Sequence, residues 1–154
     1  MRSGRAEKRE REEDILYNSK LVTQLVNMVM VKGKKSKARK IVYGALDALS
    51  SDREEAEELL RQAVNNVAPN EEVRSRRVGG ATYQVPIPVS PARAEALALR
   101  WIVESARNVE GVPMKKQLQR ELQSAVREEG NAVEKRERMH RMAEANRAFA
   151  HFRW

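Results

Sequence analysis

The residue types that most often carry catalysis or metal binding are scarce in this sequence. It contains two histidines, His140 and His151, and no cysteine. The lack of cysteine excludes a thiolate nucleophile, a disulfide scaffold and a cysteine-based zinc or iron–sulfur site. Residues 33–36 read Gly-Lys-Lys-Ser, but a phosphate-binding loop needs another glycine where Met28 stands and Ser or Thr directly after its first lysine. We therefore expect no catalytic site, no metal and no cofactor.

Basic side chains, in contrast, are abundant and unevenly distributed. Thirty Lys and Arg against 22 Asp and Glu give a net charge of +8. Residues 32–40 and residues 73–94 contain basic side chains and no acid, whereas residues 51–72 are mainly acidic. Cations grouped in this way are typical of proteins that bind a polyanion, although a lysine run is also common on a solvated face.

The second basic segment has the pattern of a β-hairpin arm at about residues 73–89. The glycine pair 79–80 separates two β-prone runs, and both glycines can adopt the positive φ of a tight hairpin turn. Arg74, Arg76 and Arg77 on the first strand repel one another unless an anion lies between them, and guanidinium groups pair well with phosphates. We expect this arm to contact nucleic acid and to become ordered against it. Packing of the hairpin on its own domain is the alternative.

Apolar residues at three- and four-residue steps predict three helices before the arm and three after it. The expected end signals before the arm are an N-cap at Asn18 or Ser19, the terminating Gly33, a capping box of Ser51 with Glu54, and the terminating Pro69. After the arm, Ser90 with Pro91 is expected to start the fourth helix, and Pro113 and Gly130 to start and end the fifth. A capping pair of Asn131 with Glu134 is expected to start the last helix, from Ala132 to about Phe149. Trp101 continues an apolar helix face and is expected in the core.

These patterns predict a mainly α fold, a six-helix domain with a protruding two-stranded β-hairpin between the third and fourth helices. Residues 1–17 are expected to form a flexible N-terminal tail, and residues 18–154 a single domain. No apolar run is longer than residues 28–31, which is far shorter than the roughly 20 residues that span a bilayer, so no membrane partner is expected.

The last expected helix combines basic and aromatic side chains. Its basic residues include Lys135, Arg136, Arg141 and Arg147, and Phe149, Phe152 and Trp154 come at its end or after it. Aromatic rings between cations can stack on exposed bases, which RNA offers more often than duplex DNA. They can equally anchor the end of the chain to the domain, and the sequence leaves both interpretations open.

Three motifs in this order resemble the small-subunit ribosomal protein seven family of the bacterial and organellar type. They are residues 31–36 (VKGKKS), residues 76–86 (RRVGGATYQVP) followed by residues 98–102 (ALRWI), and residues 140–154 (HRMAEANRAFAHFRW). The resemblance extends from about residue 17 to residue 154. It implies a helical domain with a protruding hairpin, in agreement with the pattern above.

The resemblance also implies a function. It implies a structural constituent of the small ribosomal subunit, not an enzyme, that binds the 3′ major domain of 16S rRNA and nucleates assembly of the 30S head. The family lies at the subunit interface near the E site, with its hairpin close to exit-site tRNA and the mRNA path, and its neighbours are small-subunit proteins nine and eleven. The expected location is the cytoplasm, or the stroma or matrix of an organelle.

The charge pattern and the resemblance together define the candidate contact residues. Those expected to bind rRNA are Lys34, Lys35, Lys37, Arg74, Arg76, Arg77, Arg93, Arg100, Lys135, Arg136, Arg141 and Arg147. Those expected near E-site tRNA and mRNA are Val78, Gly79, Gly80, Ala81, Tyr83 and Gln84. An architectural DNA-binding protein and an RNA-modifying enzyme are the alternatives, and the lack of a catalytic motif disfavours the second.

Overall fold

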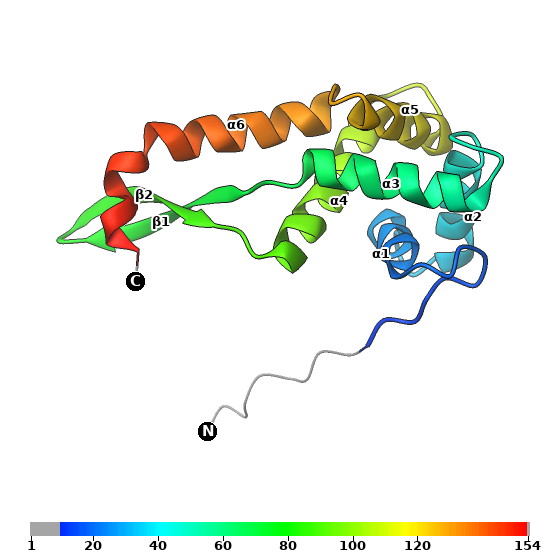
Figure 1. Ribbon diagram of the computed structural model, residues 1–154, viewed down its shortest axis with the longest axis horizontal. Coiled ribbons are helices and arrows are strands. Elements are labelled where there is room, and N and C mark those ends of the chain that lie inside the picture. The colour runs from blue at the N-terminus through cyan, green and yellow to red at the C-terminus, as the bar shows by residue number, and fades with distance from the viewer. Residues whose placement is uncertain (1–9, 154) are drawn as a thin grey trace.

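The computed structural model describes residues 10–153, and within them it confirms the predicted mainly α architecture (Figure 1). A hairpin of two antiparallel strands separates the third helix from the fourth, as expected. A short 3₁₀ helix, η1, follows the last α-helix and was not predicted. The elements are α1 (Lys20–Val29), α2 (Lys35–Leu46), α3 (Arg53–Val67), β1 (Glu71–Val78), β2 (Ala81–Pro88), α4 (Pro91–Arg107), α5 (Met114–Val126), α6 (Asn131–Ala145) and η1 (Arg147–Phe152).

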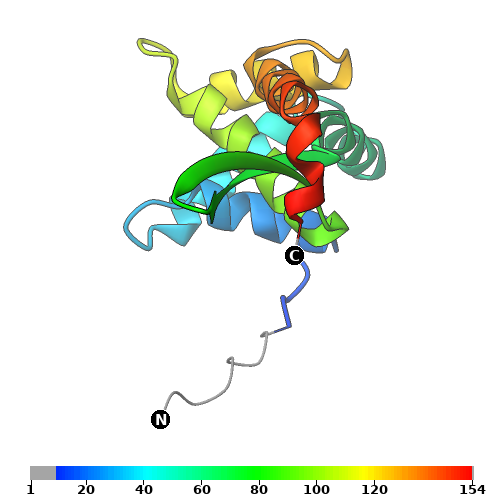
Figure 2. The same cartoon turned by 90° about the vertical axis from the view of Figure 1, so that its left-hand side faces the viewer.

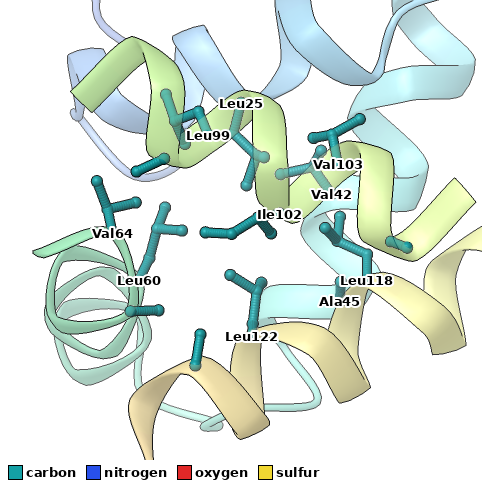
Figure 3. Close-up of a cluster of buried hydrophobic side chains, with 14 of the residues drawn as sticks. Leu25, Val42, Ala45, Leu60, Val64, Leu99, Ile102, Val103, Leu118 and Leu122 are labelled. Carbon is teal, nitrogen blue, oxygen red and sulfur yellow. The ribbon is translucent and has the colours of Figure 1, made fainter. Parts of the chain in front are cut away.

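The five helices α1 to α5 and the start of α6 enclose the hydrophobic core, with α4 running through its centre (Figures 1 and 3). Ile102 of α4 is fully buried, and the fully buried Leu60 of α3 and Leu122 of α5 belong to the same cluster. Trp101 is 8% exposed and belongs to this core, as its position on the helix face predicted. This buried cluster gives the molecule a rigid body from which the arm projects.

Two of the expected helix starts are wrong. The N-cap of α3 is Asp52 rather than Ser51, and its carboxylate accepts a hydrogen bond from the Glu54 N–H at 3.2 Å. The N-cap of α6 is Gly130, at φ +94°, and no capping box forms there. Instead, the carboxylate of Glu121 on α5 accepts the Ala132 N–H at 2.7 Å. A tertiary contact therefore supplies the cap that the sequence pattern assigned to Asn131 and Glu134.

The arm has the predicted hairpin turn but starts earlier than expected, at Glu71, and ends at Pro88. Gly79 and Gly80 have φ of +58° and +87°, which fits a two-residue turn with positive φ at both positions. Pro86 faces Val73 across the ladder. Because proline has no N–H, this must be a non-hydrogen-bonded pair, with the Pro86 carbonyl directed away from the partner strand.

The arm is packed against its own chain, which is the alternative that the sequence left open. In Figures 1 and 2, α6 extends along the arm and η1 crosses β2. The ring of Tyr83 lies 5.1 Å from that of Phe149 and 5.0 Å from that of Phe152, measured between centroids. Arg153 donates from Nε to the outward carbonyl of Pro86. Phe149 and Phe152 thus anchor the C-terminal segment to β2, whereas Trp154 lies outside the described residues.

The segment before α1 is also attached to the body. Asp14, which the sequence assigns to the tail, is buried, and the Tyr43 hydroxyl of α2 donates to it at 2.8 Å. The Tyr17 hydroxyl donates to Asp47 at 2.9 Å. Ser19, expected as a capping side chain for α1, donates its hydroxyl to Glu57 of α3 instead.

Candidate nucleic-acid interface

The first group of candidate residues lies at the beginning of α2. Lys34 is its N-cap residue, Lys35 its first residue, and both are exposed, as is Lys37. The first turn contains no acid, and no side chain caps it. Cations therefore gather where the helix dipole is already positive and where backbone N–H groups lack helical partners. Such a site attracts an anion more strongly than three lysines elsewhere on a helix would.

The second group lies on the arm, at the opposite end of the long axis from α2 (Figure 1). Arg77 is exposed and makes no ion pair with any residue that the structure describes, whereas Arg76 is half-buried. At the tip, Val78 is half-buried and Ala81 is exposed. A β-carbon built on Gly79 or Gly80 would meet no atom within 4 Å. The backbone of the turn is thus accessible to a large partner.

The two candidate residues on β2 have different surroundings. Tyr83 is turned toward the two phenylalanine rings of the C-terminal segment and supports the arm. Gln84 is exposed and donates to the Ser75 hydroxyl of β1 at 2.9 Å.

The third arginine of the arm, Arg74, shares a buried carboxylate with Arg93 of α4. Glu72 is 5% exposed; its Oε1 accepts from Arg74 Nε at 2.9 Å and its Oε2 from Arg93 Nε at 2.8 Å. Burial acts to raise the pKa of Glu72, but the hydrogen bonds from Arg93 and Arg74 outweigh it and hold this pKa below its usual value. Sequence reasoning missed Glu72, although its spacing of two residues from Arg74 places both side chains on one face of a strand.

The remaining candidates lie on α4, on α6 and after α6. Arg100 and Arg141 are exposed and unpaired among the described residues. Lys135 is 3.2 Å from Glu104 of α4, and Arg147, the first residue of η1, is 3.2 Å from Glu144. Arg136 is directed inward, where its Nη1 donates to the backbone carbonyl of Asn66 at the end of α3. Arg136 therefore joins α6 to α3, which the charge pattern could not indicate.

Within residues 10–153, no group of three or more His, Cys, Asp or Glu residues is placed to hold a metal ion. In the same part of the chain, each helix is too short or too polar to cross a bilayer.

A family model described as ribosomal protein S7p/S5e matches residues 1–147. The chain belongs to this family. The small ribosomal subunit protein uS7 of Thermosipho africanus (strain TCF52B) is 56% identical over the full length of both chains. Those of Dictyoglomus turgidum and Thermotoga maritima are 54% and 55% identical over 99% and 100% of each chain.

Membership in the S7p/S5e family confirms the resemblance seen in the three motifs. It also confirms that the chain is a structural protein of the ribosome and not an enzyme. The residue-by-residue assignments to rRNA and tRNA remain predictions.

Proposed function

We propose that this chain is a structural constituent of the small ribosomal subunit that binds the 3′ major domain of 16S rRNA directly and nucleates assembly of the 30S head. Its full-length similarity to small ribosomal subunit proteins supports this role. The observation that carries the proposal is the separation of exposed cations into the start of α2, the arm and the region of α6, all attached to one rigid helical body.

The binding mechanism follows from charge and shape. Lysine and arginine groups neutralise phosphates and release condensed counterions, so affinity falls steeply with salt. The cationic segments are held at fixed separations by the core, so a folded RNA junction of matching shape is selected over other polyanions. In this proposal residues 18–154 form a single rRNA-binding domain, preceded by the tail.

The arm is proposed to lie at the subunit interface, near exit-site tRNA and the mRNA path. The accessible backbone at Gly79 and Gly80 supports this, because a tip without bulky side chains can approach a nucleic acid closely. Val78 and Ala81 border this tip, Gln84 lies further along β2, and Tyr83 holds β2 on the C-terminal segment. Proteins nine and eleven of the small subunit are the proposed neighbours.

The double change Arg76→Glu with Arg77→Glu tests this function. We expect affinity for a 3′ major domain rRNA fragment to fall at least about 20-fold, because two phosphate contacts are lost and like charges are introduced. The slope of log affinity against log salt should become shallower by about 0.7–0.9 for each lost contact. Filter binding across a salt series measures both quantities, and circular dichroism checks that the helices remain.

A matched control carries Arg53→Glu with Arg127→Glu, two exposed positions away from the arm. It has the same change in net charge and should lose much less affinity. Equal losses in both variants would remove the arm from the interface. If duplex DNA displaces the rRNA fragment at comparable concentrations, the proposed choice of the 3′ major domain as partner is wrong.

A further inference from the structure

A hollow of about 990 Å³ lies between the segment before α1, the base of the arm and the beginning of α4. Basic side chains reach it from separate parts of the chain, namely Arg11, Lys20, Arg74 and Arg93. Its only acidic lining residue among those described is Glu95, which accepts a hydrogen bond from Gln24 at 2.7 Å. The hollow therefore has an excess of positive charge on several of its sides.

The two arginines are held in a specific orientation by Glu72. Arg74 binds Oε1 of this carboxylate with Nε at 2.9 Å and Nη2 at 2.8 Å, while Arg93 binds Oε2 with Nε at 2.8 Å and Nη2 at 2.7 Å. Each guanidinium thus uses the edge formed by Nε and Nη2 and keeps its Nη1 edge for another acceptor. The arginine side chains are 52% and 49% exposed, so solvent or a ligand reaches these unused donors.

The other two cations are available for the same ligand. Arg11 and Lys20 are exposed, and neither makes an ion pair with any residue in the range 10–153. The N-cap residue of α4, Ser90, also lines the hollow, and its hydroxyl makes no capping bond. Phosphate groups match these donors. A guanidinium group can bind two oxygens of one phosphate, and an ammonium group can bind a second phosphate as a point charge.

We propose that this hollow binds phosphate groups of an RNA backbone, and that Glu72 is the positioning residue that presets Arg74 and Arg93 for them. The inference rests on the proposed function and extends it to Arg11, Lys20 and Glu72, which neither the charge pattern nor the resemblance singled out. Glu72 fixes the two guanidinium groups before binding, so the RNA does not have to order them.

Glu72→Gln separates positioning from simple electrostatics because the two effects have opposite signs. The change removes a negative charge next to the hollow, so a purely electrostatic surface would bind rRNA more tightly. Loss of the preset arginines weakens binding instead, by about fivefold at 0.15 M salt, the expected effect of one lost phosphate contact. Glu72→Asp keeps the charge but shortens the side chain, and it should also weaken binding. Equal or tighter binding by both variants would overturn the positioning role.

The hollow itself is tested with Lys20→Gln and Arg93→Gln against Arg127→Gln, which removes one charge from an exposed site elsewhere. The salt slope for the 3′ major domain fragment should fall by about 0.7–0.9 in the first two variants and by less in the third. If the unaltered protein does not bind the fragment, the proposed function fails. If it binds and all three variants have the same slope, the hollow is not a phosphate site. Thermal unfolding followed by circular dichroism identifies any variant whose loss reflects misfolding.

Discussion

Buried carboxylates at single positions hold separate parts of this chain together. Glu72 joins the arm to α4, Asp14 joins the N-terminal segment to α2, and Glu121 caps α6 from α5. They differ in electrostatic environment. The Glu72 carboxylate has two arginine partners. The Glu121 carboxylate instead accepts the backbone N–H of Ala132 and makes no ion pair with any described residue.

Glu121 should therefore make the stability of the protein depend on pH. Burial raises the pKa of Glu121, and the hydrogen bond from Ala132 and the charge of Lys135 offset this only in part. The folded state then holds the proton more tightly than the unfolded state. Stability from this group is fully present below the ordinary carboxyl pKa and is lost as pH rises through the folded pKa.

We expect Glu121→Gln to raise the Tm at pH 7, because the amide oxygen can still accept the Ala132 N–H and no charge is buried. At about pH 4 the two proteins should have similar Tm values, since the carboxyl is then protonated in the folded state. The exposed Glu110→Gln is the control. A lower Tm for Glu121→Gln at pH 7 would show that the negative charge itself stabilises the start of α6.

At the residue scale, the charge pattern predicted which segment presents exposed lysines. Lys34, Lys35 and Lys37 are exposed as expected, because a lysine run between two apolar stripes has no core position to occupy. The pairing of Glu72 with Arg93 was not predictable, because it joins residues 21 apart in the chain and depends on how the arm meets α4. Arg136 was missed as a structural residue for the same reason.

At the scale of elements, apolar periodicity predicted the existence and order of the six α-helices and the hairpin. It did not predict η1, because Arg147–Phe152 has no helical apolar stripe and is placed by the contacts of its two phenylalanines with Tyr83. It also misplaced two caps, since a polar residue near a helix start fits several positions equally well. Tertiary contacts decide among these positions.

The contact between η1 and the arm should control how rigid the arm is. We expect Phe149→Ala with Phe152→Ala to increase amide hydrogen exchange in β1 and β2 by about tenfold, since two aromatic pairs with Tyr83 are lost. The helical core should keep its exchange rates. Met142→Ala, at an exposed position on α6, is the control. Unchanged exchange in the double variant would mean that the ladder alone keeps the arm ordered.

At the scale of the whole molecule, the core and the proposed binding surface are separate. The buried cluster around Ile102 consists of apolar side chains from α1 to α5 and from the start of α6, while the candidate contacts lie outside it. Changes to the core should therefore alter stability first, and changes to the cationic segments should alter binding first.

Ile102→Ala tests this separation. It should lower the free energy of unfolding by about 2–5 kcal/mol, because a fully buried side chain is truncated and leaves a cavity. Urea titration followed by circular dichroism measures the change, with the exposed Val109→Ala as the reference. Under conditions where Ile102→Ala is still folded, its affinity for the rRNA fragment should match that of the unaltered protein. A binding defect in the folded variant would link the core to the interface.

The position of η1 has a consequence for the order in which the protein is made. Translation proceeds from the N-terminus, so α1 to α5 and both strands are synthesised before Arg147–Phe152. Most of the helical body is thus made before the residues that pack on β2. These residues are Phe149 and Phe152, which contact Tyr83, and Arg153, which binds the Pro86 carbonyl. The packing of the arm is therefore completed after both of its strands have been made.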